Sequence, residues 1–132
     1  MKKLLIFLVI ILTLCIPVVA QENLAEGTID ETINWAIEGD GTLRVSGTGD
    51  IPNFTKSALA PWYQSRGLIT AIAVEDGITG IGDYTFYGLA NAVTIDISDS
   101  VYHLGQFFIL NHKTSAIFIN IPTLLHFSLL FL

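Results

Sequence analysis

A repeated segment is the feature that most limits the folds open to this chain. Residues 72–82 align with residues 95–105 at an offset of 23, and every branched apolar position in the segment is matched. A period of this length is typical of solenoids, in which each coil contributes a short strand and then turns back. The matched pairs are Ile72 with Ile95, Val74 with Ile97, Asp76 with Asp99, Ile78 with Val101, Ile81 with Leu104 and Gly82 with Gly105.

Side chains alternate between the two faces of a strand, and this alternation predicts which residues of the first repeat face the core. Ile72 and Val74 are expected to point inward, whereas Ala71, Ala73 and Glu75 are expected to point outward. The return limb would add two more core positions, Ile78 and Ile81. Residues 82–88 after it are expected to form a short helical or 3₁₀ piece that buries Phe86.

A β-hairpin is predicted upstream of the repeat. The apolar residues of segments 35–37 and 43–45 are spaced as in strands, and residues 38–41 between them contain two glycines. Glycine supplies the positive φ that tight hairpin turns need. Further along, residues 60–66 are expected to form one helical turn with Pro61 near its start.

The first twenty residues have the pattern of a secretory signal peptide. Lys2 and Lys3 precede an apolar run over residues 4–16, Pro17 ends that run, and small residues lead to a cut after Ala20. The sequence therefore predicts a secreted or cell-surface protein.

Composition after removal of this segment excludes several functions. The only cysteine is Cys15, which also permits a rival interpretation as an acylated lipoprotein. Residues 21–132 then hold no cysteine, four basic and twelve acidic residues, and hence a formal charge of −8. Thiol chemistry is excluded, and the negative charge argues against nucleic acid and anionic membranes as partners.

Two motifs in sequence order resemble the BspA-type leucine-rich repeat. Residues 77–88 followed by residues 93–101 are similar to its repeat, and residues 35–50 with Pro61-Trp62 are similar to the segment that precedes the repeats. The resemblance covers residues 33–105. It implies a secreted or surface-displayed solenoid for adhesion or protein recognition, without catalysis or cofactor.

The chain departs from that family pattern at several positions. Ser98 replaces a usual proline, Leu89 a frequent cysteine and Ala92 a leucine, and Ile109 stands where the next phenylalanine is expected. No repeat is legible beyond Gly105.

Four regions follow from these patterns: a signal peptide (1–20), a hairpin capping region (21–68), BspA-like leucine-rich repeats (69–105) and an atypical apolar tail (106–132). The tail is interpreted as the product of truncation of a longer array, and a weaker alternative is a membrane anchor over residues 115–132. Because so few repeats are legible, self-association is also expected.

Residues that could carry chemistry form no recognisable site. His103, His112 and His126 have neither metal-ligand nor triad spacing, and Asp76 and Asp99 recur at the repeat period, as turn-capping residues do. Aromatic residues near the first coil could stack on a sugar, but a core role is favoured; they are Trp35, Trp62 and Tyr63. The sequence predicts no metal, no cofactor and no enzyme activity.

The leading hypothesis is a non-catalytic module that binds an extracellular protein or glycan through its exposed strand face. The residues expected to contact the ligand are Glu75, Thr94, Asp96 and Ser98. Two alternatives remain open. One is a fragment of a small exported carbohydrate-active enzyme, and the other is a truncated gene product without independent function.

Export should shorten the chain. We expect the secreted protein to begin at Gln21, because Val18 and Ala20 fit the −3 and −1 positions of the cleavage pattern. Intact-mass analysis of secreted material measures this directly. A species that retains Met1, or a diacylglycerol on Cys15, would contradict the expectation.

Overall fold

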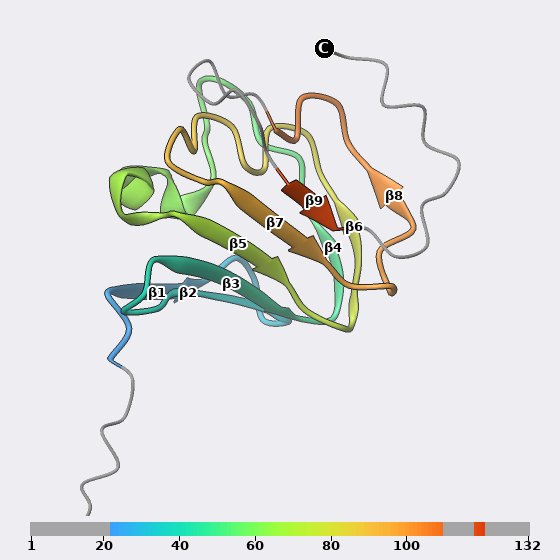
Figure 1. The fold of residues 1–132 in the computed structure, drawn as a ribbon. Coiled ribbons are helices and arrows are strands. Elements are labelled where there is room, and N and C mark those ends of the chain that lie inside the picture. Colours follow the sequence, from blue (N-terminus) through green and yellow to red (C-terminus); the bar gives the residue numbers. More distant parts are fainter. Residues whose placement is uncertain (1–21, 110–117, 121–132) are drawn as a thin grey trace, which may run out of the picture.

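The computed structural model describes residues 22–109 and 118–120, and the predicted signal peptide lies outside them. This part of the chain is mainly β, with one 3₁₀ helix among its strands (Figure 1). The elements are β1 (Ala25–Thr28), β2 (Ile33–Ile37), β3 (Thr42–Gly47), β4 (Gly49–Ile51), η1 (Pro61–Leu68), β5 (Ala71–Val74), β6 (Ile78–Ile81), β7 (Thr94–Ile97), β8 (His103–Leu104) and β9 (Phe118–Asn120).

The strands form two sheets, and the chain alternates between them. One sheet has six strands in the order β1-β2-β3-β5-β7-β9, and the other has three in the order β4-β6-β8. The predicted hairpin is confirmed, because β2 and β3 pair antiparallel on either side of the turn at residues 38–41. From β5 to β8, each coil adds one parallel strand to each sheet, and β9 adds a further parallel strand to the six-stranded sheet.

The pairing register reproduces the sequence offset in the second and third coils. Ala71 pairs with Thr94 and Gly80 with His103, and both pairs are separated by 23 positions. The first coil is longer, since Thr42 pairs with Ala71. Its additional residues include η1 and the loop that precedes it.

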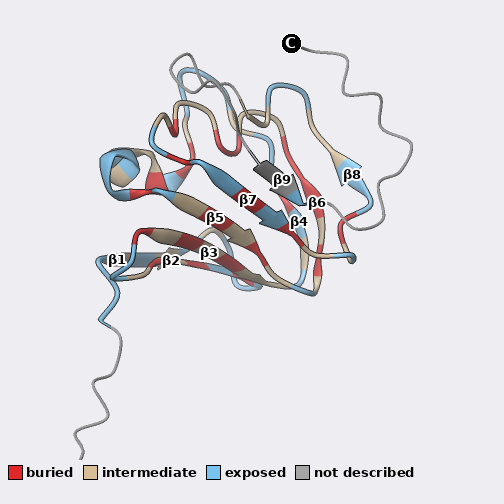
Figure 2. Cartoon of the chain, in the orientation of Figure 1, coloured by how far each residue is buried: buried red, intermediate tan, exposed pale blue. Residues whose placement is uncertain are grey.

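The inward and outward assignment of the repeat strands is correct. Ile72 and Val74 of β5 and their counterparts in β7 are buried, while the side chains between them are half-buried or exposed (Figure 2). The return limb also contributes core residues as predicted, because Ile78 and Ile81 are fully buried. One apolar core therefore lies between the two sheets.

An aromatic cluster joins the hairpin to the first coil. Trp62 of η1 is fully buried and contacts Trp35 of β2 edge to face, with ring centroids 6.0 Å apart. Phe86 stacks on Trp62 at 6.1 Å, Phe54 contacts it edge to face, and the Trp62 indole N–H donates to the Thr85 carbonyl at 3.1 Å. Both tryptophans thus belong to the core, which is the role that the sequence analysis favoured.

Three features differ from the sequence-based expectations. Strand β1 forms within the polar region before the hairpin, and β9 extends the six-stranded sheet within the segment where no repeat was legible. Residues 83–88 form turns instead of a helical piece, although Phe86 is buried as expected. Tyr84 has a φ of 55° and Gly88 a φ of 75°, and these left-handed conformations prevent a continuous helix.

Backbone contacts between coils are close at two equivalent glycines. A Cβ added at Gly82 would collide with the Pro52 carbonyl oxygen, and one added at Gly105 would collide with the backbone of Asp83. Beside each glycine, a side chain of one coil accepts a hydrogen bond from the next coil. The Asn53 Oδ1 accepts from the Asp83 N–H at 2.8 Å, and the Asp83 Oδ1 accepts from the Gln106 N–H at 2.6 Å.

The close approach at Gly82 gives a stability prediction. Gly82→Ala should lower the free energy of unfolding by about 1–3 kcal/mol, because the new methyl group forces the two coils apart. Gly67→Ala is the matched control, since a Cβ there meets no atom within 4 Å, and it should change stability by less than about 0.5 kcal/mol. Urea denaturation of both variants measures the difference. Equal effects would contradict the tight coil contact.

Candidate binding face

The outward face of the six-stranded sheet is where the exposed polar residues of successive strands align. Pairing continues without interruption across all six strands, so one residue from each strand lies in a single cross-strand row. The members of this row are Glu26, Ala36, Arg44, Ala73, Asp96 and Asn120.

Arg44 stands in the middle of the row and is held by two carboxylates. Its Nε and one terminal nitrogen donate to Glu38 at 2.8 and 3.1 Å, and its other terminal nitrogen donates to Glu75 at 2.5 Å. Glu38 lies in the hairpin turn and Glu75 follows β5, so the guanidinium bridges two segments of the sheet. Hydrogen bonds raise the pKa of Arg44 above its ordinary value, and the bonds to Glu38 contribute more than the bond to Glu75.

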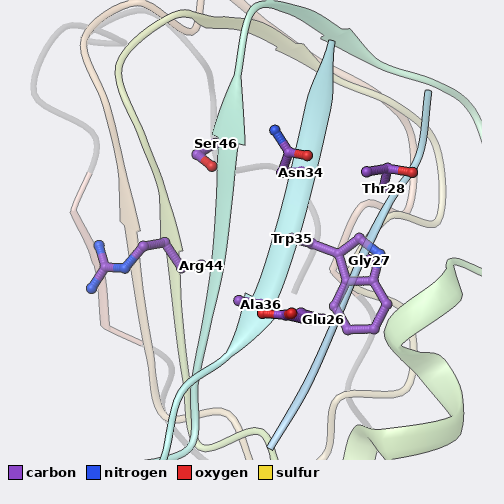
Figure 3. A pocket seen from close by; sticks show the side chains of 8 residues that line it. All are labelled: Glu26, Gly27, Thr28, Asn34, Trp35, Ala36, Arg44 and Ser46. Atoms are coloured by element: carbon purple, nitrogen blue, oxygen red, sulfur yellow. The ribbon is translucent and has the colours of Figure 1, made fainter. Parts of the chain in front are cut away.

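A hollow lies on each side of Arg44 because both of its neighbours in the row are alanines. Ala36 of β2 and Ala73 of β5 are too short to fill the space beside the long arginine side chain. The hollow on the Ala36 side, shown in Figure 3, has a volume of about 340 Å³. The hollow on the Ala73 side has a volume of about 760 Å³. Arg44 lines both and forms the ridge between them.

The two hollows differ in their lining. Glu26, Thr28, Asn34 and Ser46 surround the smaller hollow, which we call the β1–β3 hollow (Figure 3). The larger one, the β5–β7 hollow, is lined mainly by carboxylates and one hydroxyl. Its polar lining residues besides Arg44 are Glu75, Asp76, Asp96, Ser98 and Asp99.

Three of the four ligand-contacting residues expected from the sequence line the β5–β7 hollow. These are Glu75, Asp96 and Ser98, whereas Thr94 lies two residues before Asp96 on the exposed face of β7. Sequence reasoning missed Arg44. The strand spacing of Leu43 and Val45, which are both buried, indicates that Arg44 between them lies on the outward face.

Polar side chains of the β5–β7 hollow contact neighbouring strands. The Asn120 amide donates to an oxygen of Asp96 at 3.0 Å, and the Ser98 hydroxyl donates to an oxygen of Asp76 at 3.3 Å. Asp76 thus contacts the following coil. Its predicted turn-capping role, like that of Asp99, stays a prediction.

Histidines and metal ligands form no second site in the part of the chain that the structure describes. His103 lies in the other sheet, where its Nε2 is 3.7 Å from an oxygen of Asp50; His112 and His126 lie outside the described residues. Within residues 22–109 and 118–120, no group of three potential ligands could hold a metal ion. No helix in these ranges is long and apolar enough to cross a membrane.

Comparison with solved structures shows a leucine-rich-repeat-like fold. The chain is similar to a leucine-rich repeat protein from Eubacterium ventriosum, with 31% identity over 70% of this chain and a TM-score of 0.65. The chain spans only 25% of the length of that protein. No family model and no curated protein matches the sequence. The likeness supports the leucine-rich-repeat part of the resemblance found in the sequence.

Removal of the ridge gives a second stability prediction. Arg44→Gln should lower the free energy of unfolding by up to about 1 kcal/mol at low salt, because Glu38 and Glu75 lose their shared cation on a half-exposed surface. The difference from the unmodified protein should shrink in 1 M NaCl, where exposed charges are screened. Urea denaturation at both salt concentrations measures it. A loss that is independent of salt would show that Arg44 acts through packing alone.

Proposed function

We propose that this chain is a secreted or surface-displayed, non-catalytic binding protein of the BspA-like leucine-rich-repeat type. Its outward sheet face would recognise an extracellular protein or glycan, as in adhesion. The observation that carries the proposal is the pair of hollows on either side of Arg44, on a sheet face that no described segment covers.

A short solenoid with a period of 23 residues is part of the same proposal. The register offset of 23 in both sheets supports it, as does the hairpin that covers the first coil. Repeat proteins commonly bind partners through an extended face of this kind. The predicted signal peptide supports export. An exported face would meet extracellular partners.

The environment of Glu75 argues against the alternative of a carbohydrate-active enzyme. A glycoside hydrolase needs one carboxylic acid that is kept protonated, usually by apolar surroundings, to serve as general acid. Glu75 is instead part-exposed and accepts a hydrogen bond from the Arg44 guanidinium, so it does not lie in apolar surroundings. Asp96 is solvent exposed on β7. Such an open polar face is better suited to binding than to proton transfer.

Filling the β5–β7 hollow should weaken binding without disturbing the core. Ala73→Phe places a ring in the hollow from the outward face of β5, so we expect at least a tenfold loss of affinity for any partner that uses it. The measurement is binding of the purified chain to immobilised extracellular matrix proteins and to a glycan array.

Ala58→Phe is the matched control. Ala58 is exposed in the loop between β4 and η1 and lines neither hollow. Its affinity should stay within about twofold of the unmodified protein, since surface changes away from a contact have small effects. Binding that survives Ala73→Phe, with the fold intact by circular dichroism, would refute the proposed function.

A further inference from the structure

Carboxylates dominate the charge on the outward face. The two hollows and the Arg44 bridge together contain one guanidinium and six carboxylates. The carboxylates belong to Glu26, Glu38, Glu75, Asp76, Asp96 and Asp99. The face therefore has a negative potential that would attract cationic groups and repel anionic ones.

Among the described residues, the one cation on this face is already paired. Arg44 donates to both Glu38 and Glu75, so two carboxylates already balance its positive charge. The other described cations lie elsewhere. Lys56 is in the loop after β4, and the Arg66 guanidinium lies 4.4 Å from the centre of the Tyr63 ring and donates to the Tyr63 carbonyl.

We propose that the partner is a lysine- or arginine-rich segment of another protein, which lies across the strands and places one cation in each hollow. This inference rests on the proposed function, because it names the chemistry of the ligand for the same face. Charge complementarity selects the partner: a free ammonium or guanidinium can pair with Asp96 in one hollow and Glu26 in the other without breaking the Arg44 bridge.

Strand geometry sets the length of that segment. Asp96 on β7 and Glu26 on β1 are separated by four strand spacings in the same row, or roughly 19 Å at about 4.8 Å per spacing. An extended chain rises about 3.3 Å per residue, so about six residues cover this distance. Two clusters of basic residues about six positions apart would therefore match both hollows.

The test uses a labelled ten-residue peptide of alternating lysine and threonine, with a glutamate and threonine peptide as the anionic counterpart. We expect the purified chain to bind the lysine peptide in 50 mM NaCl and to lose at least tenfold in affinity in 0.5 M NaCl, because the contacts are ionic. Fluorescence anisotropy measures both. Binding of the glutamate peptide in place of the lysine peptide would overturn the proposal.

Two variants with the same change in net charge locate the contact. Asp96→Lys reverses the charge in the β5–β7 hollow, whereas Glu31→Lys reverses it in the exposed turn between β1 and β2. Asp96→Lys should weaken lysine-peptide binding at least fivefold and Glu31→Lys less than twofold. Equal losses would mean that only the overall charge attracts the peptide, and would overturn the proposal.

The ligand panel separates failure of this inference from failure of the proposed function. A matrix protein or glycan that is lost on Ala73→Phe but bound more tightly on Asp96→Lys would leave the binding face in place and overturn its preference for cations. A partner that is lost on both substitutions, but retained by Ala58→Phe and Glu31→Lys, would support both proposals.

Discussion

Burial of Trp62 is the contact on which the rest of the structure depends. Its indole ring lies where the antiparallel hairpin meets the first parallel coil, and it contacts Trp35 from the hairpin and Phe86 from the second coil. The indole N–H donates to a backbone carbonyl, so the one polar atom of this side chain is satisfied in the core. A coil cannot bury its apolar face alone. Trp62 provides the apolar surface that connects the hairpin to the coils.

Core and face are built from the same strands, and this separates stability from recognition. In β3, Leu43 and Val45 are buried while Arg44 between them projects from the sheet. In β5, Ile72 and Val74 enclose Ala73 in the same way. Alternation allows the outward residues to vary while the inward residues maintain the packing. At the two alanines beside Arg44, the size of the side chain therefore affects the shape of the surface and not the packing of the core.

Repetition and alternation made the central part of the fold predictable. The offset of 23 located β5 to β8, and the glycine turn located the hairpin. Strand β9 was missed because the period points to residues 117–119 and the pairing of Thr94 with Phe118 adds one residue. Ile109, which replaces the expected phenylalanine, still packs against the core. The Arg44 bridge was missed because its acceptors are six and thirty-one positions away, and no local pattern connects them.

Two equivalent side-chain hydrogen bonds between coils run in the same direction along the chain. Asn53 accepts from Asp83, and Asp83 in turn accepts from Gln106, so each acceptor side chain precedes the backbone donor that it binds. A polypeptide is made and delivered from its N-terminus, and N-terminal units generally fold first. The first and second coils, once folded, thus present acceptor side chains to the coils that follow them. Assembly can then proceed from the hairpin onward, because Asp83 and Gln106 of the second and third coils each meet an acceptor side chain of the coil before them.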